Sequence, residues 1–434
     1  MSTKTPLYDA INNISKQNTL RLHMPGHKGK PIPFLEEIST LDFTEIEGTG
    51  NLYEKGEPFE RAQQMWAEKF GFDNAQLLTA GSTQGVYTAL ALCKGDQILL
   101  DRNCHRSAFH AMGFLDRNPV YLQRDWVDGW EVVGQITPEE VEKSLLEYPK
   151  IRTVCITSPT YYGVLSDIQK ISDVVHKYGG KLVVDGAHGA HLPWVGVDHF
   201  RGADLVAISA HKTLPALGQS AVLLYTGFED HVVGHTASLF GSSSPSYPIL
   251  ISMDLARSYL EESGGEKYKN NAINVDKLRK KYHSIDGTNL DPTRLTLLHP
   301  QAQEVAFALE KVGIHLEMVT KNHLVAIFTS EDSDEDFHRF EEGIAPYFTT
   351  EQEIIPSYKP PSDLPKRVIS IRKGLFSENI TLPLEQTLGK VLASSLAPYP
   401  PGVPVVAIGE IVTQKALDYL EKIGYTNQQV LVVK

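Results

Sequence analysis

The sequence has few cysteines and no long apolar run. Only three of its 434 residues are cysteine, Cys93, Cys104 and Cys155, and none forms a CxxC pair. Such usage argues against a disulfide framework or a cysteine-based zinc site and is typical of a reducing compartment. No apolar run approaches the roughly 20 residues of a membrane-spanning helix. Residues 1–6 lack the apolar centre of a secretion signal. We therefore expect a cytoplasmic protein without a bound metal.

Positive charge is also scarce. The chain has 41 Lys and Arg residues against 53 Asp and Glu residues, which gives a formal net charge of −12 at pH 7. Because an acidic surface repels nucleic acid and anionic membranes, neither is expected as a partner. A chain of 434 residues is long enough for two or three domains with a large core. The composition is that of a soluble enzyme.

Short apolar runs alternate with helical patterns over residues 56–285. The runs are residues 97–100, 119–122, 153–156, 182–184, 205–208 and 221–224. Near-continuous apolar strands separated by helices predict a mostly parallel sheet covered on both faces. New strand and helix patterns predict a small C-terminal α+β domain at 286–434. Residues 1–55 contain Gly/Pro-rich stretches and predict an extended N-terminal arm. The expected fold class is α/β.

A charged residue follows each of two successive apolar runs. Asp185 closes the run 181–184, and Lys212 comes four residues after the run 205–208. In parallel sheets, ligands bind at the carboxyl ends of the strands. A lysine amine can bond the aldehyde of pyridoxal 5′-phosphate (PLP), and an aspartate can keep the PLP pyridine nitrogen protonated. A lone Lys or Asp is usually a solvated surface charge, but the two together at strand ends predict a PLP site.

A small-residue segment, Gly81-Ser82-Thr83, precedes a helical apolar pattern. Small residues let backbone N–H groups approach a phosphate at a helix N-terminus, and the two hydroxyls add donors. The same pattern suits an ordinary helix cap. With Asp185 and Lys212 downstream, we favour phosphate binding.

Histidines and a serine surround the predicted cofactor. His105 follows the run 97–100, where an imidazole can stack on the PLP ring and carry protons. The alternative is a loop histidine that caps local backbone. Ser209 and His211 flank the lysine and can contact the phosphate or the departing group. His188, three residues after the aspartate, can contact the ring edge.

Weaker patterns mark further residues. Thr160 and Tyr161 follow the run 153–156 and either line the pocket or serve a turn. Four glutamates crowd the arm and its end: Glu45, Glu47, Glu54 and Glu57. One of them can pair with a cationic substrate group, or all four form a solvated face.

Together these segments resemble the fold-type-I PLP-dependent Orn/Lys/Arg decarboxylases in their short bacterial form. The matching motifs span nearly the whole chain in the family's order, at residues 23–29, 43–46, 81–83, 103–107, 185–191, 209–213, 244–248 and 399–404. The resemblance implies a PLP-dependent transferase fold of type I. Such a fold has a mostly parallel seven-stranded sheet sandwiched by helices and a small C-terminal α+β domain.

The resemblance also implies roles for single residues. Lys212 would bond PLP, Asp185 would partner the pyridinium nitrogen, and His105 would stack on the ring. Either Lys212 or His211 would protonate the product carbon. The phosphate and the ring edge would be served by Gly81, Ser82, Thr83, Ser209, His211 and His188. A homodimer with sites at its interface is implied as well.

The implied reaction is decarboxylation of arginine, lysine or ornithine to the corresponding amine and CO₂, as in polyamine biosynthesis. One departure is that Gly50-Asn51 stand where relatives often have paired Asp residues. This change removes acidic groups from a segment expected near the substrate. Two alternatives therefore stay open: another PLP reaction, such as a transamination or a lyase step, and a non-catalytic relative. A stacking histidine favours decarboxylation, because transaminases more often stack an aromatic ring.

Overall fold

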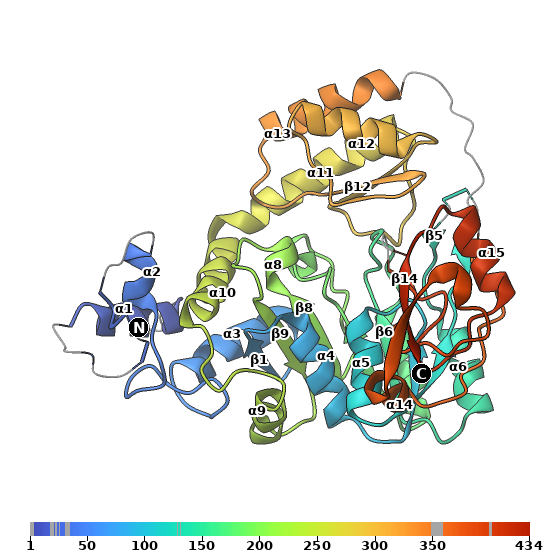
Figure 1. The fold of residues 1–434 in the computed structure, drawn as a ribbon. Coiled ribbons are helices and arrows are strands. Elements are labelled where there is room, and N and C mark those ends of the chain that lie inside the picture. Colours follow the sequence, from blue (N-terminus) through green and yellow to red (C-terminus); the bar gives the residue numbers. More distant parts are fainter. Residues whose placement is uncertain are drawn as a thin grey trace. The chain divides into compact units, whose positions relative to one another are not determined.

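The computed structural model describes residues 4–17, 21, 24–25, 27–30, 35–127, 129–130, 132–348, 359–398 and 402–434 (Figure 1). The chain divides into two compact units. Unit 1 comprises Met1–Leu92, Leu182–Ile273 and Phe328–Glu331, and unit 2 comprises Cys93–Lys181, Asn274–Ile327 and Asp332–Lys434. The matched motif positions 23, 26 and 399–401 lie outside the described residues. The expected domain limits near residues 55 and 285 stay a prediction.

The strands of unit 1 carry the segments that end in Asp185 and lead to Lys212. They are β1 (Asn74–Leu78), β7 (Lys181–Asp185), β8 (Leu205–Ser209) and β9 (Ala221–Tyr225), in the order β1-β9-β8-β7. β7 and β8 are parallel, β9 runs antiparallel to β8, and β1 runs antiparallel to β9. Every residue of β8 and β9 is buried. This burial matches their uninterrupted apolar runs.

Helices pack on these strands. Those in unit 1 are α1 (Pro6–Ser15), α2 (Glu36–Leu41), α3 (Phe59–Phe70), α4 (Gly81–Leu92), α8 (Ala210–Thr213), α9 (Asp230–Ser238), α10 (Tyr247–Tyr259) and the first part of α11 (Gly265–Lys281), with short helical turns at Leu192–Trp194 and Leu260–Gly264. α3 packs on β1 and β9, and α4 packs on β8 and β9. A Cβ atom at Gly85 of α4 would lie 2.9 Å from the Cβ atom of Ala207 on β8. The glycine therefore lets the helix and the strand approach closely.

The N-terminal arm is anchored by α1. α1 packs against α3 and α10, and both Leu7 and Ile11 are 0% exposed. The backbone N–H groups of Leu7 and Tyr8 donate to the Asp254 carboxylate at 3.0 and 3.1 Å. A carboxylate satisfies N–H groups that lack partners in the first turn of a helix. Apolar burial and this contact together hold the start of the chain on unit 1.

Unit 2 contains three parallel strands and several small antiparallel pairs. The parallel strands are β2 (Gln97–Asp101), β3 (Asn118–Leu122) and β6 (Thr153–Thr157), in the order β6-β2-β3. The antiparallel strands are β4 (Trp126–Val127) with β5 (Val132–Val133), β10 (Arg294–Leu298) and β11 (Met318–Val319) with β12 (His323–Ile327), and β13 (Asn379–Pro383) with β14 (Gln429–Val433). With the four strands of unit 1, the three parallel strands confirm the predicted mostly parallel, seven-stranded set.

The helices of unit 2 complete the predicted α/β and α+β parts. They are α5 (Arg106–Phe114), α6 (Pro138–Glu147), α7 (Ile168–Lys177), the end of α11, α12 (Ala302–Lys311), α13 (Asp334–Ile344), α14 (Ile371–Phe376) and α15 (Gln414–Lys422), with short turns at Ala345–Tyr347 and Leu384–Gln386. A separate apolar core near the C-terminus contains Leu392, Val406, Leu420 and Val432, each 0% exposed. Among the described residues, no helix is long and apolar enough to cross a membrane.

We predict that Ile11→Ala destabilises the protein by about 2–5 kcal/mol, because it removes a fully buried side chain and leaves a cavity between α1 and its neighbours. Urea or thermal unfolding measures the loss. The matched control is Asn13→Ala on the exposed face of the same helix, which should leave the unfolding midpoint nearly unchanged. Equal shifts for the two variants would show that α1 does not pack as described.

Candidate functional site

The register of β7 and β8 brings two predicted site residues to one edge of the sheet. Asp185, the last residue of β7, pairs with Ala207, two residues before the end of β8 at Ser209. The Asp185 side chain is almost fully buried, and its Oδ1 accepts a hydrogen bond from the backbone N–H of Ala187 at 3.2 Å. Ser209 is fully buried. The carboxyl ends of the two parallel strands therefore present a buried carboxylate and a hydroxyl together.

Lys212 follows this edge on the short helix α8. Its side-chain nitrogen Nζ lies 3.3 Å from Nε2 of His188, which is buried. Because a lysine ammonium can only donate, this contact requires His188 to accept through Nε2 and to carry its ring proton on Nδ1. The structure thus joins two of the predicted residues, one from the segment after β7 and one from the segment after β8.

The residue after the lysine is held by an aromatic side chain, itself stacked on a second one, and the sequence reasoning identified neither. The Tyr268 hydroxyl donates to the carbonyl oxygen of Thr213. The Tyr268 ring in turn stacks on the buried ring of His191, with 5.5 Å between centroids. Since α8 is only four residues long, this contact from α11 limits how far its end can move.

The small-residue segment begins α4, as predicted. Gly81 has a φ of +72°, and a Cβ atom there would meet no heavy atom within 4 Å. The Ser209 hydroxyl donates to the Ser82 hydroxyl at 2.8 Å, which connects the end of β8 with the start of α4. Thr83 follows in the first turn and is half-buried. The helix N-terminus therefore lies beside two hydroxyls and open space, a combination that suits an anion.

His211 points its Nδ1 atom at the carbonyl oxygen of Ser220, 2.9 Å away. Since a carbonyl only accepts, Nδ1 carries a proton in this contact. Two nearby hydroxyls, Thr213 Oγ1 and Ser220 Oγ, are buried and have no hydrogen-bond partner among the described residues. Buried hydroxyls without partners are costly, so a bound polar group would relieve a penalty here.

His105 belongs to unit 2, where it is the N-cap of α5. Its Nδ1 accepts from the backbone N–H of Ser107 at 3.3 Å and lies 2.9 Å from the Ser107 hydroxyl. The capping alternative raised from the sequence is therefore present in the structure. Ring stacking by His105 stays a prediction.

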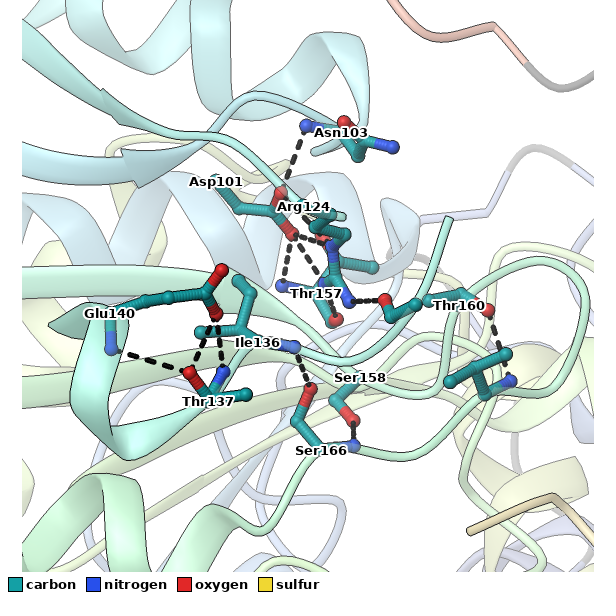
Figure 2. A network of polar contacts seen from close by, with 12 residues as sticks. Asp101, Asn103, Arg124, Ile136, Thr137, Glu140, Thr157, Ser158, Thr160 and Ser166 are labelled. Atoms are coloured by element: carbon teal, nitrogen blue, oxygen red, sulfur yellow. Dashed lines mark hydrogen bonds and ion pairs between the residues drawn. The ribbon is translucent and has the colours of Figure 1, made fainter. Parts of the chain in front are cut away.

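The strand ends of unit 2 are joined by a buried ion pair (Figure 2). Arg124 Nη2 lies 2.6 Å from Asp101 Oδ2, and both side chains are 0% exposed. The sequence reasoning missed this pair, although one signal was present: Asp101 is a charged residue that ends an apolar strand, as Asp185 does. The two residues are far apart in the chain, and their spacing does not reveal that they meet.

Thr160 and Tyr161 follow β6, as expected. The Thr160 hydroxyl accepts from the backbone N–H of Val164 at 3.0 Å, and the Thr160 N–H donates to the Val164 carbonyl at 2.9 Å. The Tyr161 hydroxyl donates to Glu317 at 2.5 Å. Thr160 thus serves the turn, which is the second of the two alternatives given for it.

A separate polar cavity of about 630 Å³ lies in unit 1. Its lining comes from residues 53–64, β1 and the segment 225–238, and includes Tyr53, His231 and His235. It contains none of the predicted cofactor residues, so its size alone does not make it the functional site. Among the described residues, no cluster of His, Cys, Asp or Glu side chains is arranged to hold a metal ion.

Comparisons with known proteins agree with the geometry. The family model for the Orn/Lys/Arg decarboxylase major domain matches residues 5–345, and the model for the C-terminal domain of the same family matches residues 371–430. The chain is 29% identical to the uncharacterized protein YaaO of Bacillus subtilis (strain 168), over 96% of this chain and 94% of that protein. It is 26% identical to an arginine decarboxylase of the same organism, over 96% and 93%.

A solved structure has the same fold. The lysine decarboxylase LdcF of Francisella novicida superposes with a TM-score of 0.83 at 20% identity, over 99% of this chain and 81% of that chain. The expected fold of type I is thereby confirmed. The family models cover the major and C-terminal domains in order, and the relatives with an assigned activity are named as amino-acid decarboxylases. This chain therefore belongs to the Orn/Lys/Arg decarboxylase family.

Proposed function

We propose that this enzyme decarboxylates arginine with PLP held on Lys212. The observation that carries the proposal is the parallel pairing of β7 with β8, which supports a common site for Asp185 and the segment that leads to Lys212. A homodimer with sites at its interface and a cytoplasmic location are part of the proposal. Lysine or ornithine as the preferred substrate, transamination, and a non-catalytic role are the alternatives.

The residues present fit PLP. A lysine amine suits the aldehyde, and a buried carboxylate suits a protonated ring nitrogen. The start of α4, with Ser82 and Ser209 in contact at 2.8 Å, suits the phosphate. The unpartnered hydroxyls of Thr213 and Ser220 are additional donors. When bound, PLP supplies an electron-accepting ring that stabilises the negative charge left when CO₂ departs.

His188 is the side chain placed to exchange a proton with Lys212. A lysine reacts with a carbonyl only as the free amine, so its ammonium must first lose a proton. His188 Nε2, at 3.3 Å from Nζ, is placed to accept that proton. The same contact can return it, which favours Lys212 over His211 as the group that protonates the product carbon. Nδ1 of His211 is already engaged with the Ser220 carbonyl.

Asp185 acts through charge. Burial would normally raise the pKa of a carboxyl group, and a cation at hydrogen-bond distance reverses this tendency. A pyridinium nitrogen would provide such a cation, and the N–H of Ala187 already donates to Oδ1. The carboxylate would therefore keep the ring protonated, and a protonated ring accepts electrons more readily, which lowers the energy of the transition state.

Relatives support arginine as the first choice of substrate. The arginine decarboxylase of Bacillus subtilis is 26% identical and matches along 93% of its own length. The Francisella novicida lysine decarboxylase is 20% identical and is covered along 81% of its length. A decarboxylase that resembles the first protein in both identity and length is more simply explained as acting on arginine.

Glu45 is proposed to bind the cationic end of the substrate. Its Oε2 accepts from the Thr44 hydroxyl at 2.6 Å, whereas its buried Oε1 has no hydrogen-bond partner among the described residues. Glu47, Glu54 and Glu57 are exposed and fit the solvated alternative. A guanidinium can satisfy a carboxylate oxygen of this kind with two donors.

The surroundings of Glu45 support this assignment. Burial raises the pKa of Tyr247 to about 12, and the nearby Glu45 charge adds to the shift. Burial and the same charge also raise the pKa of Tyr53. The Tyr53 hydroxyl accepts from Gln84 on α4 at 3.2 Å, three residues after Gly81. Glu45 therefore acts electrostatically on a tyrosine that contacts the proposed phosphate helix.

We predict that PLP-loaded protein shows a visible absorbance band and that borohydride reduction attaches the cofactor to Lys212. The reason is that Lys212 is the lysine held beside His188 at the strand ends. Peptide mapping by mass spectrometry identifies the labelled residue. Lys212→Ala should lose the band and the label, while the exposed Lys177→Ala should keep both. A label on another lysine would refute the assignment.

We predict that Asp185→Ala binds PLP but lowers kcat by on the order of 10²- to 10³-fold, with a smaller effect on KM, because the lost charge acts mainly in the transition state. Asp204→Ala is the matched control, since Asp204 is also a buried carboxylate that accepts from a backbone N–H, that of Leu182. The control should lower stability without this kcat effect. A change confined to KM in Asp185→Ala would contradict the proposed role.

We predict that CO₂ release from arginine exceeds release from lysine, ornithine and neutral amino acids. Glu45→Gln should raise KM for arginine by about 10- to 100-fold, because a guanidinium loses its charged partner, while the absorbance band of bound PLP is retained. Glu57→Gln is the exposed control. Assays of CO₂ and of keto acid on the same samples separate decarboxylation from transamination. Keto acid without CO₂ would replace the proposed reaction.

A further inference from the structure

Gln84, in the first turn of α4, is a polar side chain that the proposed chemistry does not use. It is 1% exposed, and it lies in unit 1 together with the residues that its amide contacts. Burying an amide costs free energy unless its N–H groups and its oxygen find partners, whereas an apolar residue could fill the same space without that cost. A buried glutamine at this position therefore indicates a requirement for particular hydrogen bonds.

The Gln84 amide bonds to three separate parts of unit 1. Its Oε1 accepts from the backbone N–H of Ala80 at 3.2 Å. Its Nε2 donates to the carbonyl oxygen of Ala237 in α9 at 2.9 Å and to the Tyr53 hydroxyl at 3.2 Å. One side chain thus connects the residue that precedes Gly81 with α9 and with the segment before α3.

The contact with Ala80 bears on residues 81–83, here called the phosphate segment. The first of them has a φ of +72°, and its N–H donates to the carbonyl oxygen of Gln219 at 2.8 Å. No group of the described residues accepts from the N–H of Ser82 or Thr83. Because N–H groups in the first turn have no partner within their own helix, these two are available to an anion. The turn that leads into α4 decides where they point.

The main chain at Gly241 packs against the contact between Gln84 and Tyr53. A Cβ atom at Gly241 would collide with both Gln84 Nε2 and the Tyr53 hydroxyl oxygen. Only glycine therefore leaves the amide and the hydroxyl in their present positions. The Gln84 amide is confined by packing as well as held by hydrogen bonds.

We propose that Gln84 is a positioning residue for the phosphate segment. Its oxygen fixes the N–H of Ala80 and so sets the turn into α4, while Ala237 and Tyr53 hold the amide in place. The inference deepens the proposed function and rests on it, because the segment has a phosphate to hold only if PLP binds. Gln84 acts through the main chain of the segment and does not touch the cofactor itself.

The test compares PLP with pyridoxal, which has the same ring and aldehyde but no phosphate. Gln84→Met in full-length apoprotein keeps a long side chain and removes the three hydrogen bonds. We expect the Kd for PLP to rise roughly tenfold, the size expected when buried partners lose a hydrogen bond. The Kd for pyridoxal should change less than about twofold. Titration followed by the visible absorbance band measures both values, and the phosphorus NMR signal of bound PLP should shift as well.

Gly241→Ala tests the same amide without changing it. The added methyl group displaces the ends of the Gln84 and Tyr53 side chains, so the same loss of affinity for PLP, and not for pyridoxal, is expected. Should Gln84→Met fail to fold, the result for Gly241→Ala stands in its place. Equal weakening of PLP and pyridoxal in either folded variant would overturn the proposal, because the effect would then not pass through the phosphate.

Gln76→Met is the matched control for loss of a buried glutamine in unit 1. Gln76 lies on β1 and is 4% exposed, and its Nε2 donates to the carbonyl oxygens of Leu52 and Leu77 at 3.0 and 3.2 Å. The control should lower stability and leave the ratio of the two Kd values unchanged. A selective loss of PLP in Gln76→Met would assign the effect to general loosening of unit 1 and refute positioning.

The borohydride label on Lys212 separates this inference from the proposed function. If the wild type takes no label on Lys212, the proposed function fails and this inference fails with it. If the wild type is labelled while Gln84→Met binds PLP and pyridoxal as the wild type does, the inference alone fails.

Discussion

The parallel alignment of two strands with apolar centres, β7 and β8, is the constraint on which the site of unit 1 depends. Because their carboxyl ends meet at one edge, an acid that closes the first strand lies beside the segment that follows the second. A shift of the register by one residue would turn Asp185 to the opposite face of the sheet. The buried carboxylate, the hydroxyl contact between Ser82 and Ser209, and the short helix that carries Lys212 all follow from this alignment.

Six of the seven strands of the large sheet could be predicted from the sequence because apolar runs of the right length mark them, but the antiparallel direction of β9 could not. β1 was missed, because the run Asn74–Leu78 contains a glutamine, and this side chain is buried while it donates to the carbonyl oxygens of Leu52 and Leu77. The composition of β9 does not indicate that it pairs antiparallel with β8 and β1. The apolar segment 403–408 does not form a strand: Val406 forms only an isolated bridge to Leu396, while the last strand is β14.

The site was predictable where its residues are close in the chain or end a strand. Asp185 and Lys212 satisfy that condition, and the motif around His105 does so in part. The side chains that hold these segments in place could not be predicted. Tyr268 reaches Thr213 from 55 residues away, and Arg124 reaches Asp101 from 23 residues away. Contacts of this kind depend on how helices and strands pack, which a pattern of residue types does not encode.

Gly85 lies so close to Ala207 that one added methyl group at Gly85 would force α4 and β8 apart. α4 begins with the segment proposed to hold a phosphate, and β8 leads to the lysine proposed to hold the aldehyde at the other end of the same molecule. A larger residue at either position would therefore push the start of α4 away from the end of β8 and so move the proposed phosphate site relative to Lys212.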